Sequence, residues 1–458
     1  MRVDDLRELF YLWEGVYPHL SSFFLSLYGR EEGDFLEFGP FSGGVARELA
    51  RSFPRFRGAI SGVEGESASF MREMMREELK EERLLLKPSS LSSIPFLDGS
   101  FDLVILRGAF FFLTSSLLRE VERVLAPGGV GIVGGGYGPF TPQGVFSPIA
   151  SRSRELNRRL GKRWISREEL EGMAREAGIE GWEVREEGGL WLILKKGGSP
   201  ESFQSLSSAL SLKEKEVISL VGGGGKTTLM FSLARELAEG GDKVITTTTT
   251  KIFEPHPWQT PCVIVEEERA SLMGRAKEAL KRYNHVTLGR GRLREQGKLL
   301  GIDEDWVEEL RRLVPYVIVE ADGARRLPIK APSEGEPVIP PSTTLLLPVV
   351  GVDAVGKPLD ERWAFRPERV SELTGLPLGV PISPQAVVTL LLHPRGITKG
   401  RPPQARVLHF INKVETGEDL RRAEEIARGL SRRDKGVVLG RIFFHRAVIR
   451  VVSPATLP

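Results

Sequence analysis

The feature that most constrains the fold is the segment VISLVGGGGKTTLMFSLARELAEGG, Val217 to Gly241. Val217–Val221 is continuously apolar and rich in β-branched residues, which is typical of a buried parallel strand. From Thr228 to Ala238, apolar residues recur at helical spacing. The four glycines between them therefore lie at a strand-to-helix turn, where backbone N–H groups and the helix dipole attract an anion. This segment predicts an α/β domain with a phosphate-binding loop.

The glycine loop predicts how a nucleotide would be held. Glycines adopt the positive φ angles that turn successive N–H groups inward. Lys226 is expected to reach the terminal phosphates, and the Thr227 hydroxyl to coordinate Mg²⁺. The loop is two residues shorter than usual, so a tight glycine turn with an unrelated lysine is the alternative. The predicted nucleotide-binding residues of this segment are Gly222, Gly223, Gly224, Gly225, Lys226, Thr227 and Thr228.

Two acids follow a later strand, in PYVIVEADGA. Glu320 and Asp322 are two residues apart, so on a strand they share a face. Their carboxylates would crowd each other unless a cation lay between them or one took up a proton. Mg²⁺ carried by nucleotide phosphates is the natural partner at a strand's carboxyl end. We predict both acids as metal ligands with Thr227 and as catalytic residues with Lys226; a solvated turn is the alternative.

Two further strand ends carry candidate nucleotide contacts. In KVITTTTTKIF, Thr249 and Lys251 would emerge beside the phosphates, although a threonine run is also good strand material. In ARVLHFINKVE, the residues Asn412, Lys413 and Glu415 follow the pattern Asn-Lys-x-Asp, which reads guanine in guanine-nucleotide proteins. Glutamate replaces the usual aspartate, so the pattern suggests guanine, with a chance match as the alternative.

The first half of the chain repeats the alternation of strand, glycine-rich turn and helix. DFLEFGPFSGGVARELARSF predicts a strand at Phe35–Phe38 and a helix from about Val45. A second strand is expected to end at Glu64 and a third to cover Leu103–Leu106. A helix, a Pro-Gly-Gly turn and another strand follow in LLREVERVLAPGGVGIVGG. Such alternation predicts a parallel sheet.

This order, with the phrases IPFLDGSFDLV and REVERVLAPGGV, resembles the class I S-adenosylmethionine-dependent methyltransferases over roughly residues 30–195. The resemblance implies that S-adenosylmethionine is bound by Glu37, Gly39, Gly43 and Glu64, the last on the ribose hydroxyls. Three residues depart from the family pattern, namely Phe41 at a glycine position, Ser90 at an adenine contact and Phe111 at an often polar position. The half is therefore either a working methyltransferase or a fold retained for packing or docking.

The second half carries an ordered set of motifs: LVGGGGKTTLM, TTTTTKI, VEADGARRLPIKAP, EPVIPPSTT, VVGVDAVGKPL and FINKVE. Together they resemble the YqeC family, whose members are identified as accessory proteins of selenium-dependent molybdenum hydroxylases. In that family the short glycine loop is the rule. The resemblance covers about Ser211 to Val452 and places Gly323 in the site beside the residues named above. Lys330 and Glu336 match a family segment that faces a substrate or is a plain loop.

Composition limits the remaining classes. The 64 basic and 61 acidic residues nearly cancel, so the chain as a whole offers no nucleic-acid footprint. A single cysteine, Cys262, rules out an internal disulfide framework and fits a reducing compartment. Without a secretory signal or a bilayer-spanning run, a cytoplasmic protein is expected. A Gly/Ser/Pro-rich stretch near Gly198 predicts two domains, residues 1–197 and 198–458.

We therefore predict two doubly wound parallel-sheet domains, a Rossmann-like methyltransferase fold followed by a P-loop NTPase-like fold. The second would bind and hydrolyse ATP or GTP with Mg²⁺ during maturation of a selenium-dependent molybdenum hydroxylase or its cofactor. The expected partners are the nucleotide and that hydroxylase or cofactor, with no nucleic acid or membrane. Two alternatives are a small-molecule kinase, with its acceptor near Lys330 and Glu336, and a non-catalytic nucleotide-binding scaffold whose methyltransferase domain is degenerate.

Overall fold

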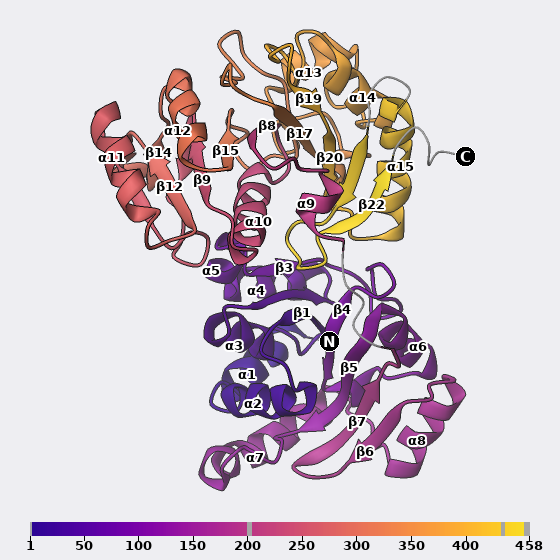
Figure 1. The fold of residues 1–458 in the computed structure, drawn as a ribbon. Helices are drawn as coiled ribbons and strands as arrows, with labels where there is room; N and C mark the ends of the chain where they lie inside the picture. Colours follow the sequence, from indigo (N-terminus) through magenta and orange to yellow (C-terminus); the bar gives the residue numbers. More distant parts are fainter. Residues whose placement is uncertain (1, 199–203, 432–435, 453–458) are drawn as a thin grey trace. The chain divides into compact units, whose positions relative to one another are not determined.

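The structure, a computed structural model, describes residues 2–198, 204–431 and 436–452. The chain divides into two compact units, Met1–Ser202 and Phe203–Pro458 (Figure 1). The division follows the Gly/Ser/Pro-rich stretch, four residues beyond Gly198.

The first unit is built on one seven-stranded sheet with the order β3-β2-β1-β4-β5-β7-β6. Strands β1 to β5 are parallel, whereas β7 pairs antiparallel with both β5 and β6. The strands are β1 Gly33–Phe38, β2 Phe56–Ser61, β3 Leu84–Leu86, β4 Phe101–Arg107, β5 Leu125–Gly136, β6 Trp182–Arg185 and β7 Gly189–Lys195. The order reverses between β1 and β4, and ligands of doubly wound sheets bind beyond the carboxyl ends at such a point.

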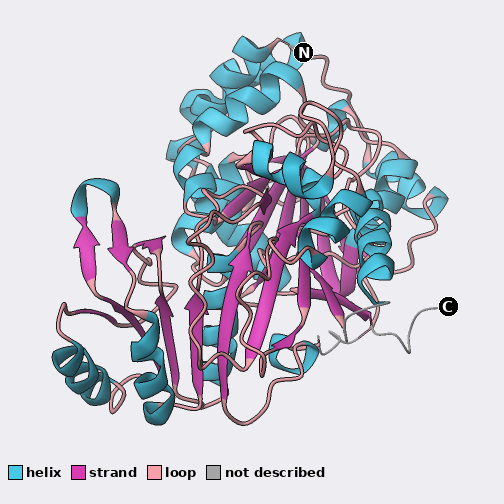
Figure 2. Cartoon of the chain, turned by 90° about the horizontal axis from the view of Figure 1, so that it is seen from above, coloured by secondary structure: helices cyan, strands magenta, loops and turns pink. Residues whose placement is uncertain are grey.

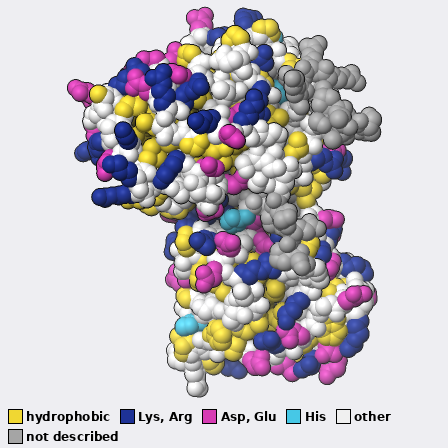
Figure 3. Space-filling view, in the orientation of Figure 1, with side chains coloured by type: hydrophobic (Ala, Val, Ile, Leu, Met, Phe, Trp, Pro, Cys, Tyr) yellow, Lys and Arg dark blue, Asp and Glu magenta, His cyan; other side chains and the backbone are white. Residues whose placement is uncertain are grey.

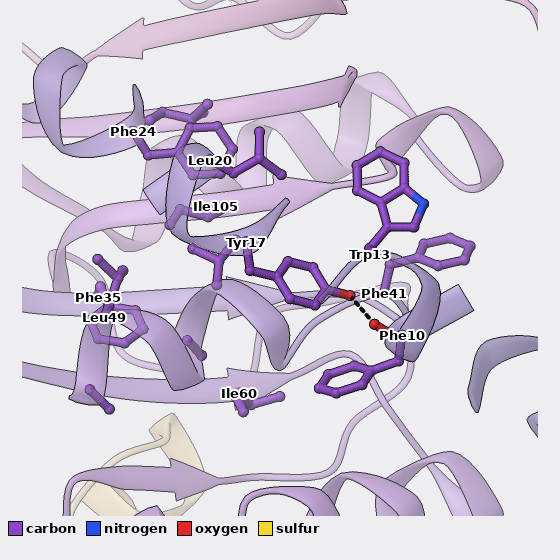
Figure 4. Close-up of a cluster of buried hydrophobic side chains, with 14 of the residues drawn as sticks. Phe10, Trp13, Tyr17, Leu20, Phe24, Phe35, Phe41, Leu49, Ile60 and Ile105 are labelled. Carbon is purple, nitrogen blue, oxygen red and sulfur yellow. Dashed lines mark hydrogen bonds between the residues drawn. The ribbon is translucent and has the colours of Figure 1, made fainter. Parts of the chain in front are cut away.

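Helices connect these strands and also precede them. They are α1 Val3–Leu12, α2 Tyr17–Tyr28, α3 Gly44–Ser52, α4 Gly65–Met74, α5 Arg76–Lys80, α6 Ser115–Val124, α7 Gln143–Arg159 and α8 Arg167–Glu176, with the 3₁₀ turn η1 Ala109–Phe111. Helices α1 and α2 were not predicted from the sequence. Their aromatic side chains, including Phe10, Tyr17 and Phe24, share one buried core with Phe35 of β1 and Ile105 of β4 (Figure 4).

Three details of the first unit differ from the predicted elements. β2 ends at Ser61 rather than Glu64, because Gly62 turns the chain with a φ of 74°. Strand β3 was not predicted; it is only three residues long, too short to give a pattern. The Pro-Gly-Gly sequence does not form a separate turn before the last predicted strand. It lies within β5, which begins directly after α6, and the β4–β5 pairing shifts its register nearby.

The second unit contains a ten-stranded sheet in which β8 is central, with the order β11-β12-β9-β15-β8-β17-β20-β21-β22 and β19 beside β17. All its pairs are parallel except β21–β22. The strands are β8 Glu216–Gly222, β9 Val244–Thr248, β11 Val263–Val265, β12 His285–Gly289, β15 Tyr316–Glu320, β17 Leu345–Gly351, β19 Arg406–Val407, β20 His409–Asn412, β21 Val437–Gly440 and β22 Val448–Val452.

Two smaller sheets and several helices complete the second unit. The smaller sheets join β10 Lys251–Phe253, β14 Lys298–Leu300 and β13 Gly291–Leu293, and β16 Ile329–Lys330 with β18 Ala364–Phe365. The helices are α9 Leu206–Ala209, α10 Lys226–Glu239, α11 Arg269–Ala279, α12 Val307–Leu313, α13 Pro367–Thr374, α14 Pro384–Leu392 and α15 Gly417–Ser431, with 3₁₀ turns η2 Arg294–Gln296, η3 Glu304–Trp306 and η4 Val352–Ala354. In Figure 2 the strands lie side by side between helices.

The register of the second sheet determines where side chains meet. Glu320 at the end of β15 lies opposite Leu220 of β8, and Gly222 lies opposite Val349 of β17. The strand ends that carry the glycine loop and the two acids are therefore adjacent. Two doubly wound α/β sheets confirm the predicted fold class.

The last features of the fold are the charge distribution on the surface and the lengths of the helices. Basic and acidic side chains are interspersed on the face shown in Figure 3, in keeping with the near balance of charges in the sequence. Within the described residues, no helix combines the length and apolar character needed to cross a bilayer.

Candidate functional site

The glycine loop lies between the end of β8 at Gly222 and the start of α10 at Lys226. It is packed against backbone atoms on both sides. At Gly224, where φ is 70°, an added Cβ would lie 2.2 Å from the backbone nitrogen of Gly351. At Gly223, it would lie 2.6 Å from the carbonyl oxygen of Leu327. No larger residue fits either position without moving backbone.

The loop amides do not form the expected inward-facing series. The N–H of Gly222 donates to Asp322 Oδ2 at 3.0 Å. The N–H groups of Gly223 and Gly224 donate to the carbonyl oxygens of Val349 and Leu327, each at 2.9 Å. The prediction was wrong for these three because a loop this short stays within reach of its neighbouring strands. No side chain caps the first turn of α10, and a helix N-terminus of this kind attracts an anion.

Lys226 lies between the two predicted acids. Its Nζ donates to the Gly222 carbonyl at 2.6 Å and lies 3.1 Å from Asp322 Oδ1 and 3.7 Å from Glu320 Oε1. The side chain is only 4% exposed. Burial alone would lower the pKa of Lys226, but the charges of Asp322 and Glu320 outweigh it and raise the pKa. The ammonium group is thus the cation that separates the two carboxylates in this structure.

Thr227 and Glu320 form the second contact of the site. The Thr227 hydroxyl donates to Glu320 Oε2 at 2.6 Å. Burial raises the pKa of Glu320, although Lys226 acts in the opposite direction. Within the described residues, no group of three or more His, Cys, Asp or Glu side chains could hold a metal ion by itself. A Mg²⁺ ion at this position would therefore take some of its oxygen ligands from a bound phosphate.

A chain of alternating charges extends from Asp322. Its Oδ2 lies 3.1 Å from Lys330 Nζ, which also donates to the Gly323 carbonyl at 2.8 Å and to Glu336 Oε2 at 2.9 Å. Glu336 Oε2 in turn accepts from Arg366 at 2.7 Å. Lys330 has no exposed surface, and its contacts hold Asp322 and Glu336 in place.

The remaining residues predicted to contact the nucleotide differ in their burial. The Thr249 N–H donates to the Glu320 carbonyl at 3.2 Å and its hydroxyl to the Val338 carbonyl at 2.7 Å, which ties its strand end to the acid strand. Lys251 is exposed at the start of β10. Thr228 is half-buried in the first turn of α10.

The Asn412 segment contacts the glycine loop directly. Asn412 Nδ2 donates to the Gly224 carbonyl at 2.6 Å, and its Oδ1 accepts from the Ile442 N–H at 3.0 Å. The amide therefore supports the loop backbone. Lys413 pairs with Asp353 at 2.8 Å, and Glu415 is buried.

Some residues of this site were not predicted. Arg366, which shares Glu336 with Lys330, follows β18 and is 44 residues beyond Asp322 in the sequence. The carbonyl groups of Val349 and Leu327 accept hydrogen bonds from the loop amides. Every residue has a carbonyl group, so the type of residue does not reveal such an acceptor. Both Arg366 and these acceptors could be identified only by knowing which distant segments of the chain become neighbours in the fold.

In the first unit, Glu37 supports the turn after β1. It is fully buried, and its Oε2 accepts from the N–H groups of Gly43 and Ala46, both at 2.8 Å. Burial raises the pKa of Glu37, with Arg107 acting against the rise at an Nε–Oε1 distance of 4.0 Å. Glu37 therefore holds the N-terminal end of α3 in place. Glu64, the predicted ribose acid, is exposed and precedes α4.

Aromatic rings fill the space beside the first glycine turn. A Cβ on Gly39 would lie 2.7 Å from Phe112 Cζ, so this ring covers the face of Gly39. Phe41, 5% exposed, contacts Phe111 with ring centroids 4.6 Å apart. Ser90 is exposed, and its hydroxyl lies 2.7 Å from that of Ser92.

These residues do not fit S-adenosylmethionine in the conformation observed. Glu64 lies three residues beyond the end of β2, at the N-cap of α4. The close approach that Gly39 would permit is taken by Phe112 of the same chain. Movement of the segment after η1 would be needed before a cofactor could reach the turn.

Comparison with known proteins agrees with the geometry of the second unit. Residues 218–368 match the family described as YqeC protein. The protein YqeC of Escherichia coli (strain K12), described as uncharacterized, is 32% identical over 242 residues, which cover 52% of this chain and 92% of that protein. The chain belongs to the YqeC family. The matched YqeC region contains the glycine loop, Glu320, Asp322, Lys330 and Arg366.

In the first unit of this YqeC chain, residues 36–133 match the family described as Methyltransferase domain. A SAM-dependent methyltransferase from Aquifex aeolicus is 17% identical with a TM-score of 0.33, over 43% of this chain and 97% of that one. Geranyl diphosphate C-methyltransferase from Streptomyces coelicolor A3(2) is 13% identical with a TM-score of 0.30, over 39% and 78%. The fold itself is defined by the strand order given above.

Proposed function

We propose that the second unit binds a Mg²⁺-complexed nucleoside triphosphate and hydrolyses it. One observation carries this proposal. Lys226, Thr227, Glu320 and Asp322 come from two neighbouring strand ends and converge within ion-pair or hydrogen-bond distance at the uncapped start of α10. A helix N-terminus with an adjacent lysine is a site for phosphate.

Each residue has a distinct part in this proposal. The Lys226 ammonium stabilises negative charge on the phosphoryl oxygens, which is the main requirement of phosphoryl transfer. Asp322 holds both Lys226 and the Gly222 amide in place. The Thr227 hydroxyl and Glu320 are the side chains that would hold Mg²⁺. When bound, Mg²⁺ supplies further positive charge to the phosphate oxygens.

The cellular role in the proposal comes from the family. Resemblance to YqeC proteins supports a part in the maturation of a selenium-dependent molybdenum hydroxylase or its cofactor. Nucleotide hydrolysis would drive a conformational change in that process. The contacts of Asn412 with the glycine loop leave ATP and GTP both to be tested.

For the first unit we propose no methyl-transfer step. Its methyltransferase fold supports S-adenosylmethionine as the ligand class, with Glu64 on the ribose. The aromatic side chains beside Gly39 oppose binding in the observed conformation. The unit would serve as a methyltransferase only after the Phe112 segment moves.

The test is phosphate release from ATP and GTP, each with and without Mg²⁺. We expect slow Mg²⁺-dependent release by the wild type and at least tenfold less by Lys226→Ala. Thr227→Val removes only the hydroxyl and should raise the Mg²⁺ concentration needed, whereas Thr227→Ser should not. Lys281→Ala, at an exposed position, is the matched control. Equal rates for wild type and Lys226→Ala would refute the proposal; tight nucleotide binding without turnover would identify a scaffold instead.

A further inference from the structure

An unusual turn lies directly against the glycine loop, between β15 and β16. Arg325 and Arg326 are its two central residues, and the Leu327 N–H donates to the Ala324 carbonyl at 2.9 Å to close it. Both arginines have positive φ, at 50° and 63°. Such a turn is of type I′, in which glycine, asparagine and aspartate predominate. The Leu327 carbonyl accepts from Gly224, so the turn is joined to the glycine loop.

The two arginine side chains spread over two aromatic rings. The Arg325 guanidinium lies 4.9 Å from the ring centre of Phe365, and that of Arg326 lies 4.6 Å from the ring centre of Phe253. Both arginines are exposed. Within the part of the chain that the structure describes, neither guanidinium pairs with a carboxylate, unlike Arg366 beside them, which pairs with Glu336.

More positive charge surrounds these rings. Arg366 lies 4.3 Å from the centre of Phe365, and Lys298 lies 5.2 Å from the centre of Phe253. Arg366 also has a positive φ, 61°. Glu336 is the acid of this group, and it is shared between Lys330 and Arg366. Arg325 and Arg326 thus add positive charge to this group without an ion pair to any described carboxylate.

An unfavourable backbone conformation in a residue that glycine could replace implies a role for its side chain. A guanidinium beside an aromatic ring can stack on it and keep N–H donors free for other partners, and these donors match the oxygens of phosphate or carboxylate groups. We propose that Arg325 and Arg326 bind the phosphate or carboxylate group of a second, small-molecule substrate beside the nucleotide. The place of this substrate next to the nucleotide rests on the proposed function; the anion site itself does not.

The test uses phenyl phosphate as the probe, titrated calorimetrically into the full chain saturated with Mg²⁺ and a non-hydrolysable ATP analogue. The double variant Arg325→Gly/Arg326→Gly removes both charges and suits the positive φ angles, so the protein should remain folded with an unchanged or higher Tm. We expect its dissociation constant for phenyl phosphate to rise at least tenfold. Its affinity for the nucleotide should change less than twofold. Arg282→Ala, at an exposed position remote in sequence, is the control.

Other outcomes overturn the inference. Phenyl phosphate binding by the double glycine variant equal to that of the wild type would refute it, as would no binding by the wild type. Competition between probe and nucleotide, with binding lost in Lys226→Ala, would place the probe on the glycine loop and also refute it. If the ATP analogue does not bind, the proposed function fails, while titration of the unliganded chain still decides the role of the two arginines.

Discussion

The most informative residues are the five that form the chain of alternating charge, which is buried at one end and half-buried at Glu336 and Arg366. Lys226, Asp322, Lys330, Glu336 and Arg366 each contact a neighbour of opposite sign. A buried charge is tolerated when it is paired, and losing one partner leaves the other uncompensated. The position of Lys226 at the start of α10 therefore depends on residues as distant as Arg366.

Glu336→Gln tests this dependence through pH. Hydrogen bonds from Arg366 and Lys330 outweigh burial and lower the pKa of Glu336 from 4.5 to about 2. Because its pKa is lowered on folding, Glu336 contributes its full stabilisation above pH 4.5. This contribution is lost as the pH falls from 4.5 to about 2. We expect Glu336→Gln to reduce the free energy of unfolding by about 2 kcal/mol at pH 7, measured by urea denaturation.

The difference between wild type and Glu336→Gln should become smaller at pH 3 than at pH 7. Glu334→Gln is the matched control, because Glu334 is an exposed acid two residues away. A constant difference at both pH values would show that Glu336 does not act through its charge.

At the scale of elements, the glycine turn of the first unit is closed by the segment after η1. Phe112 covers Gly39, and Phe111 packs on Phe41. In a working cofactor site, the turn after the first strand is open to a ligand. The turn and its closing segment therefore decide together whether a ligand can reach Gly39.

Phe112→Ala tests this closure. Removing the ring opens the face of Gly39, so we expect S-adenosylmethionine to bind at least tenfold more tightly than to the wild type, measured by calorimetric titration. Phe53→Ala is the control, since Phe53 is also half-buried but follows the other end of α3. Equally tight binding by wild type and Phe112→Ala would show that the ring is not the obstacle.

Much of the secondary structure could be predicted from the sequence, because buried strands and amphipathic helices place apolar residues at characteristic spacings. The strand at Val217–Val221 and the acid strand before Glu320 were confirmed as β8 and β15. Helix α10 begins at Lys226, two residues before the predicted start. The pairings of the loop amides and of Arg366 could not be predicted, because they depend on which strands become neighbours in the sheet.

At the scale of the whole molecule, the family match lies within the second unit, at residues 218–368. The Escherichia coli protein matches over 92% of its own length with only 52% of this chain. Each unit also has its own hydrophobic core and its own central sheet. The activity proposed for the second unit should therefore not require the first.

Residues 203–458 produced alone test that independence. We expect this fragment to fold cooperatively and to release phosphate from nucleotide within twofold of the full chain, measured by the same assay and by circular dichroism. The fragment carrying Lys226→Ala is the control for contaminating activity. A fragment that folds but is inactive would show that the first unit contributes to the reaction.

The tight backbone surroundings of the glycine loop also affect how such a motif is to be understood. A side chain at Gly223 or Gly224 would collide with main-chain atoms of the strand and turn on either side, with or without a ligand. A descendant that had lost all chemistry would still be obliged to keep these glycines in order to fold. The lysine and the two acids are therefore the more informative part of the motif, because burying their charges is costly and the packing of the loop alone does not require them.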